Sequence, residues 1–251
     1  MNPVVADVSV AIGLSIAMAI ALDIGFRAGR RAAMDEHAPA GNQVGAVQGA
    51  ILGLLGLLLA FSFAAAGSRF VERQDLIAQE ANAIGTAWLR ADLLDEPARS
   101  ELRAALQTYT AHRLSVRQAQ GWEASALAEV DQLHARIWRA ASAGVRARPE
   151  LALLILPPVN EVLDVHALRV NATRKHIPGL VLGLLLTSSL LAITVIGYGC
   201  GMDGRRRWPL TLSLTLLIAG SLWITIDLDH PRRGLLRLND APLQALVFTP
   251  P

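Results

Sequence analysis

The feature that most constrains this chain is a run of 25 residues, 44–68, that contains no charged side chain. About 20 apolar residues in a helix are enough to cross the ~30 Å hydrocarbon core of a bilayer. No proline separates this run from the polar residues that follow it, up to Pro97. The sequence therefore predicts one helix that crosses a membrane and continues beyond it.

Three further apolar runs give a total of four predicted spans, at about residues 5–26, 44–66, 177–199 and 208–226. With 53% hydrophobic and 18% charged residues, the chain is too apolar for an ordinary soluble domain of this length. Arg27, Arg30 and Arg31 follow the first apolar run instead of preceding it. That order predicts an uncleaved helix and not a secretory signal.

The polar segment between the second and third spans has the spacing of helices. Ile77 and Ile84 lie seven residues apart, Ala81 lies between them, and Trp88 follows four residues after Ile84. This spacing is typical of a coiled-coil seam. No alternation of useful length predicts a strand, so we expect an all-α integral membrane protein. The expected organisation is a transmembrane hairpin (1–68), a helical extramembrane domain continuous with the second span (69–176), a second hairpin (177–228) and a C-terminal tail (229–251).

Prolines divide the extramembrane segment into its predicted helices. Pro97 follows two acidic residues and suits the first turn of a helix. Pro149 and the pair Pro157 and Pro158 predict further boundaries, because a proline disfavours continuation of the helix before it.

Small residues occupy one side of the second span. At 100° per residue, Gly45, Gly49, Gly53 and Gly56 fall within one narrow stripe. Close helix packing is the favoured interpretation, because such stripes are common at helix interfaces in membranes. A pore-lining face is the alternative.

Asp23 lies at the end of the first apolar run, where a carboxylate is costly. It could form an ion or proton site, or it could pair with Arg27 four residues later. The local pairing is the favoured interpretation.

The sequence offers little catalytic chemistry. It contains no phosphate-binding loop, dinucleotide fingerprint, zinc-protease helix or nucleophile elbow, so no enzyme is expected. Cys200 is the single cysteine and no two histidines are four residues apart, so neither a metal site nor a cofactor is expected. Asp227, Asp229 and His230 could bind a cation weakly, but two carboxylates fall short of a complete site and a helix end is favoured. The arginines are spread along the chain, so nucleic acid is not an expected partner.

Residues 61–114 resemble the bacterial bestrophin-like family of four-span membrane proteins, most specifically through Glu80-Ala-Asn-Ala-Ile-Gly-Thr86. Residues 156–170 and 226–243 are similar to the family as well. Bestrophins themselves, to which this family is remotely related, are pentameric anion channels with a pore along the second helix. No bestrophin pore motif or calcium clasp can be matched residue by residue. The resemblance implies a homo-oligomer, with a pentamer as the expected form, in the lipid of the bacterial inner membrane.

Polar residues within the family segments predict a buried network between the first and last helices of the extramembrane domain. Its members would be Glu80, Asn82, Thr86, Asn160, Asp164 and Arg169. A role in fixing helix contacts is favoured over a ligand site.

Two classes of function remain. The first is an oligomeric, anion-leaning channel for a small inorganic ion, with a path that narrows at Phe61 and Phe63 beside the second span. Arg69 and Arg73 would then raise the anion concentration at its mouth. The alternative for both phenylalanines is contact with lipid or with a neighbouring helix.

The second class is a non-conducting membrane scaffold or signalling protein that binds a partner through its helical domain. Orientation is open in either class. The arginines after the first span favour a cytoplasmic 27–43 loop, whereas the resemblance implies a cytoplasmic middle domain with both termini. We adopt the second orientation.

Overall fold

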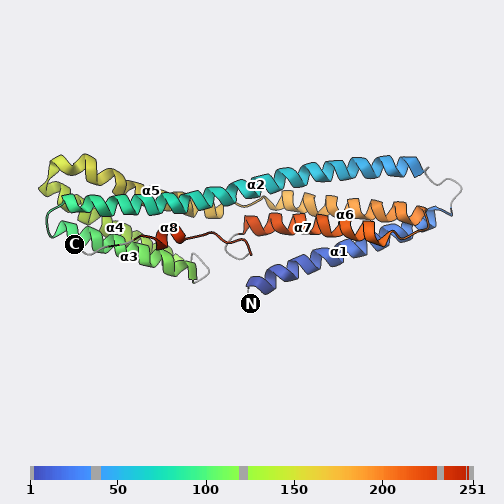
Figure 1. The fold of residues 1–251 in the computed structure, drawn as a ribbon, viewed down its shortest axis with the longest axis horizontal. Helices are drawn as coiled ribbons and strands as arrows, with labels where there is room; N and C mark the ends of the chain where they lie inside the picture. The colour runs from blue at the N-terminus through green and yellow to red at the C-terminus, as the bar shows by residue number, and fades with distance from the viewer. Residues whose placement is uncertain (1–2, 35–40, 119–123, 231–234, 247, 249–251) are drawn as a thin grey trace. The chain divides into compact units, whose positions relative to one another are not determined.

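The computed structural model describes residues 3–34, 41–118, 124–230, 235–246 and 248, and these form helices without any strand (Figure 1). The long helices are α1 (Pro3–Ala32), α2 (Gly41–Arg90), α3 (Ala98–Gln118), α4 (Ala124–Ala147), α5 (Ala152–Arg174), α6 (Gly179–Met202) and α7 (Trp208–Asp229). Short helices are η1 (Ala91–Leu93), η2 (Pro149–Leu151) and α8 (Ala241–Gln244). The predicted all-α class is confirmed.

Four helical stretches are long and apolar enough to cross a membrane. They lie within Ser9–Ala32, Gln43–Leu93, Pro149–Met202 and Trp208–Asp229. The expectation of a multi-pass membrane protein with four spans is confirmed, and α2 runs without interruption over 50 residues.

The chain forms two compact units. The apolar unit comprises residues 1–70 and 176–237, and the polar unit comprises residues 71–175 and 238–251. The last residues of the chain, from Leu238 on, therefore group with the polar helices and not with the span that precedes them.

In the apolar unit, α1, α6 and α7 lie side by side (Figure 1). Their buried core includes Met18, Leu185, Ile193 and Leu222, and Leu55 of α2 is buried with them. Lipid supplies no hydrophobic force between helices, so such a bundle depends on close packing and hydrogen bonds. Gln48 provides one such bond, from its side-chain amide to the Val195 carbonyl (2.9 Å).

Four glycines set the crossing of α1 and α6. A Cβ on Gly25 or Gly29 would overlap the carbonyl oxygens of Thr194 and Tyr198. A Cβ on Gly197 or Gly201 of α6 would likewise overlap carbonyl oxygens of α1. Each helix thus contributes two glycines four residues apart, and the two backbones touch without side chains between them.

The polar unit has a core of its own. Ile84 of α2, Leu106 of α3, Ile137 of α4 and Val159 of α5 are completely buried in one cluster. Figure 1 shows α3, α4 and the start of α5 following one another around it, and α8 lies against α3. The heptad-like positions of α2 that the sequence indicated, from Ile77 to Trp88, are buried in this core.

The C-terminal segment is fixed onto the polar unit by several contacts. Gln74 and Asn239 exchange two hydrogen bonds of 2.7 and 2.8 Å between side chain and backbone. Leu243 is buried, and the Phe248 ring packs on Trp88 at 4.6 Å between centroids. This segment completes the core of the polar unit.

The structure differs from the sequence-based expectation at one proline pair. Pro157 and Pro158 lie inside α5 instead of ending a helix before it. A proline at 158 leaves the Leu154 carbonyl without its helical donor. Arg90 supplies a replacement, because its guanidinium donates to the Leu154 oxygen at 2.8 Å.

Candidate functional site

The glycines predicted to pack helices lie on a side of α2 that has no neighbour among the residues that the structure describes. A Cβ on Gly45, Gly49, Gly53 or Gly56 would meet no heavy atom within 4 Å. The opposite side of the same helix carries Leu55, which is buried. Any helix that packs on the small-residue stripe must therefore come from another molecule, and packing by this stripe stays a prediction.

Phe61 and Phe63, the predicted gate, are both exposed. Their exposed fractions are 66% and 47%, the first among the largest for apolar side chains of α2. Ser62 and Ala66 of the same helix are buried. The two rings are thus presented outward from the chain, where lipid, water or a second copy can meet them.

Arg69 and Arg73, the predicted mouth charges, both have partners. Arg69 pairs with Asp229 at 3.2 Å (Nε to Oδ1). Arg73 is buried and donates to the carbonyl oxygens of Ala172 (3.1 Å) and Lys175 (2.6 Å). These carbonyls close α5, and a cation at a helix C-terminus is favourable. Arg73 therefore serves as a C-cap for α5.

The acidic residues at the end of α7 also bond within the apolar unit. Asp227 accepts the backbone N–H groups of Leu235 and Leu236, each at 2.9 Å. Asp229 accepts the Ile177 N–H at 2.9 Å in addition to its pair with Arg69. These bonds fix Leu235 and Leu236 to the end of α7 and hold the start of the third span.

His176, Asp229 and His230 form a group whose ligand atoms all lie within 4.8 Å of one another, a grouping that could hold a metal ion. Both carboxylate oxygens of Asp229 already accept a donor, and the Arg69 charge beside them opposes a cation. The imidazoles of His176 and His230 stack at 4.8 Å. Their Nδ1 atoms lie 3.1 and 3.2 Å from backbone carbonyls, which explains their orientation without an ion.

Glu80 is the centre of a buried network in the polar unit. Its Oε1 accepts hydrogen bonds from the Tyr109 hydroxyl (2.5 Å) and from Nε of Arg113 (3.1 Å). Its Oε2 pairs with Arg169. The Tyr109 oxygen lies 3.1 Å from Nδ1 of His166. Because the tyrosine donates its proton to Glu80, it can accept one from His166, so α2, α3 and α5 are joined at a single carboxylate.

Burial controls the titration of this network. It lowers the pKa of His166 to about 3, with the Arg113 charge adding to the effect. It also lowers the pKa of His134 of α4, whose ring packs on the rings of Tyr109 and His166, and it raises the pKa of Tyr109. Both histidines are thus neutral at physiological pH, which suits a packing role in a fully occupied cluster.

The other residues predicted for the network lie elsewhere. Asn82, Asn160 and Asp164 are exposed and Thr86 is half-buried, whereas Glu80 and Arg169 come together. Tyr109, Arg113 and His166 complete the cluster and were not predicted. Their signal was weak, because a tyrosine or histidine on a helix face resembles an ordinary core residue.

The match to known families agrees with this architecture. The Bestrophin-like domain matches residues 13–243, which is nearly the whole chain. The chain belongs to the Bestrophin-like family. No curated protein and no solved structure matches it.

Within this Bestrophin-like chain, the surface most open to a functional role is the membrane half of α2. In the most apolar window of α2, 11% of the residues are buried, against 33% for α7. The glycine pairs of α1 and α6 were not predicted from the sequence. They already contact the backbone of each other's helix, so they are not open to a partner. The spacing of two glycines four residues apart on each helix could have indicated this contact from the sequence.

Proposed function

We propose that this Bestrophin-like protein is an oligomeric ion channel whose path follows the membrane half of α2. The family is the first support, because bestrophins are anion channels and their pore lies along the second helix. The observation that carries the proposal is the uncovered side of α2. The open stripe from Gly45 to Gly56 and the outward rings of Phe61 and Phe63 leave this side of α2 free to face a second copy or a water-filled path.

The proposed path narrows at Phe61 and Phe63. Bulky apolar rings can close a pore by excluding water, and these two lie one turn or less from small residues on the same helix. Residues two apart on a helix lie about 160° apart around its axis, so in an oligomer one phenylalanine from each copy would line the path and form a ring at one height. This arrangement would make the aromatic ring the gate.

Anion preference follows from the family and not from the mouth charges. Arg69 is neutralised by Asp229, and Arg73 is buried against α5 carbonyls. Glu72, on the same turn, pairs with Lys175 at 3.1 Å. The proposed preference for chloride over sodium is therefore modest, because these charges are balanced within the chain.

Ion flux from liposomes containing the purified protein tests the channel. We expect chloride flux above that of empty liposomes, and a higher flux for the double variant Phe61→Ala with Phe63→Ala. A matched control is Leu210→Ala with Leu217→Ala on α7, two side chains that are as exposed as the phenylalanines. No chloride, sodium or potassium flux from folded protein would overturn the proposal.

Assembly is a separate part of the proposal. We expect a homo-oligomer, with five copies as the expected number from the bestrophins. Mass measurement of the protein in detergent tests this expectation. A monomer would argue against a pore along α2.

We also propose that the protein resides in the bacterial inner membrane, with the polar unit and both termini in the cytoplasm. An alkaline phosphatase fusion at the C-terminus is then expected to be inactive, because the enzyme needs the periplasm to form its disulfides. An active fusion would reverse the orientation.

A non-conducting scaffold is the second candidate, and one observation favours it. The polar unit exposes large apolar side chains away from its core, with Leu153 at 85% and Leu89 at 70%. Exposed leucines in a polar unit are typical of a protein contact. A monomer without flux, whose stability does not depend on Phe61 or Phe63, would favour this candidate.

A further inference from the structure

The exposed side of α1 carries a regular ridge of isoleucines. Ile12, Ile16, Ile20 and Ile24 are four residues apart, and each is between 54% and 58% exposed. At ~1.5 Å per residue the ridge is about 18 Å long, which is more than half of a ~30 Å hydrocarbon core. An acyl chain of one leaflet can therefore follow the ridge along most of its length.

An open surface groove of about 420 Å³, lined by α1 alone, runs along this ridge from Ile16 and ends at charged side chains. Its lining consists of Ile16, Ala19, Ile20, Asp23, Ile24 and Arg27. The groove is apolar for most of its length and polar at one end only. Its shape and chemistry match an amphipathic molecule.

The charged end is held in place by one carboxylate between two guanidiniums. Asp23 pairs through Oδ2 with Arg27 and through Oδ1 with Arg206, each at 2.6 Å. Two positive charges meet one negative charge, so the group has a net charge of +1. The side chain of Arg27 is 71% exposed and faces the outside of the bundle.

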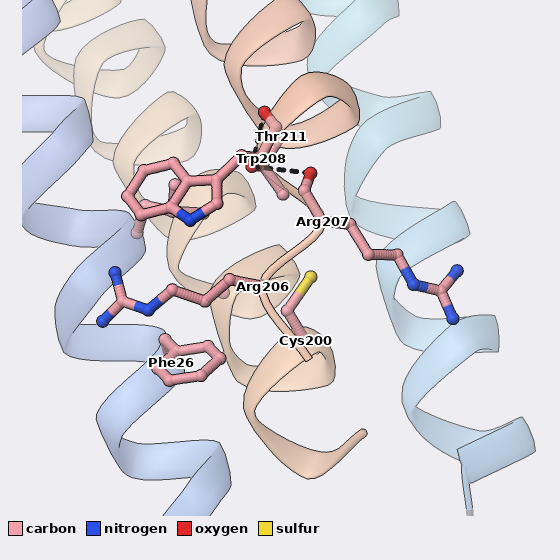
Figure 2. Close-up of a pocket in the computed structure, with 8 residues that line it drawn as sticks. Phe26, Cys200, Arg206, Arg207, Trp208 and Thr211 are labelled. Atoms are coloured by element: carbon pink, nitrogen blue, oxygen red, sulfur yellow. Dashed lines mark hydrogen bonds between the residues drawn. The ribbon is translucent and has the colours of Figure 1, made fainter. Parts of the chain in front are cut away.

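Aromatic rings fix the second guanidinium. The Arg206 guanidinium carbon lies 4.2 Å from the centre of the Phe26 ring and 5.3 Å from that of Trp208. Figure 2 shows the Arg206 side chain reaching out with Phe26 on one side and Trp208 on the other. Trp208 is 56% exposed, and tryptophan is enriched at the headgroup level of membranes. A headgroup phosphate beside these guanidiniums would lie at the level that tryptophan favours.

Further arginines lie at the same end of the apolar unit. Arg30 and Arg31 of α1 and Arg205 and Arg207 of the α6–α7 connection are all exposed. Together with Arg27 and Arg206 they make six positive charges, against Asp23 and Asp203 and, in the sequence between α1 and α2, Asp35 and Glu36. Six minus four leaves +2, so this end of the apolar unit attracts anions.

We propose that the α1 groove and its arginine cluster bind an anionic phospholipid of the bilayer. The phosphate lies at Arg27, with Arg30 and Arg205 around it, and one acyl chain lies along the isoleucine ridge. Guanidiniums bind phosphate oxygens through charge-assisted hydrogen bonds, so an arginine cluster at the ends of membrane helices suits an anionic headgroup. A free anion suits the groove less well than a phospholipid, because it would leave the apolar part of the groove unfilled.

Native mass spectrometry and thermal unfolding in detergent test the site with added phosphatidylglycerol and, separately, phosphatidylcholine. We expect the full-length protein to retain more phosphatidylglycerol than phosphatidylcholine. We also expect phosphatidylglycerol to raise its thermal midpoint by more. The triple variant Arg27→Gln, Arg30→Gln, Arg205→Gln is expected to lose this preference by about 10-fold or more in apparent affinity. The single variant Arg205→Gln gives a smaller loss and serves if the triple variant does not fold.

The matched control is Arg136→Gln, Arg139→Gln, Arg146→Gln on α4, which makes the same change in charge at three exposed arginines. It is expected to keep the preference. Equal loss in both triple variants would overturn the site, because net charge alone would explain it. An unchanged preference in the Arg27 triple variant, or equal stabilisation by inorganic phosphate alone, would overturn it as well. None of these outcomes depends on ion flux, so the lipid site can be disproved without any consequence for the proposed channel.

Discussion

The two units of this protein hold their crossing helices together by different interactions. In the apolar unit, Gly25 and Gly29 of α1 meet Gly197 and Gly201 of α6 and bring the backbones into contact. In the polar unit, the Glu80 carboxylate gathers donors from α3 and α5. Lipid offers no hydrophobic force between helices, so close approach is what remains there. Away from lipid, an apolar core supplies the force and the buried charge selects one arrangement.

We expect the largest effect at Glu80, whose carboxylate joins the helices of the polar unit. Glu80→Ala leaves Arg113 and Arg169 buried without their carboxylate, and we expect a loss of about 3–5 kcal/mol in unfolding free energy. Denaturant unfolding followed by tryptophan fluorescence measures it. Glu150→Ala, which removes an exposed carboxylate that pairs with Arg148, is the control and should cost less than about 1 kcal/mol. A small loss at Glu80 would mean that the carboxylate does not organise the polar unit.

The glycine crossing should be the next most sensitive point. Gly29→Leu places a side chain against the Tyr198 backbone and is expected to cost about 1–3 kcal/mol or to prevent folding. Gly13→Leu on the same helix meets open space and should leave the thermal midpoint in detergent nearly unchanged. Similar midpoints for both variants would contradict the close crossing of α1 and α6.

Acid should weaken the polar unit through its neutral histidines. The folded-state pKa of His166 is about 3, well below the unfolded value of 6.5, so the unfolded chain binds the proton more readily. The contribution of His166 is complete above pH 6.5, declines as the pH falls toward 3, and amounts to about 2 kcal/mol lost at pH 5. Unfolding curves at pH 8 and pH 5 test this, and His166→Gln should reduce the difference between them.

The α2 stripe sharpens the comparison in another way, because its glycines face no described part of the same chain. Gly49→Leu with Gly53→Leu is expected to leave the folded chain intact but to shift the protein toward smaller species in detergent. Light scattering on size-exclusion chromatography measures the assembly. Wild-type oligomer size in the double variant would place the stripe against lipid or open space.

The smallest effect is expected at the polar residues that lie on the surface. Asn82→Ala and Asp164→Ala should each change the unfolding free energy by less than about 0.5 kcal/mol, since both side chains are exposed. A coupling of more than about 0.5 kcal/mol in a double-mutant cycle would show that they share a network after all.

Several features of this fold depend on local sequence alone. Hydropathy and the absence of charge determined the four spans, and the lack of proline before Pro97 determined that α2 continues past residue 68. Helical periodicity identified the buried positions from Ile77 to Trp88. Family membership followed from a short motif around Glu80. These features are readable because each is a property of neighbouring residues.

Tertiary structure decided which residues have partners. Gly25 and Gly49 are both small residues in apolar helices, yet only the first has a backbone against it. Glu80 and Asn82 belong to the same motif, yet one is buried with Arg169 and the other is exposed. Pro158 is tolerated within α5 because Arg90, 64 residues from Leu154 in sequence, bonds to the carbonyl that the proline leaves free. Spacing along one helix fixes a face, but the element that covers that face is set by packing between distant segments.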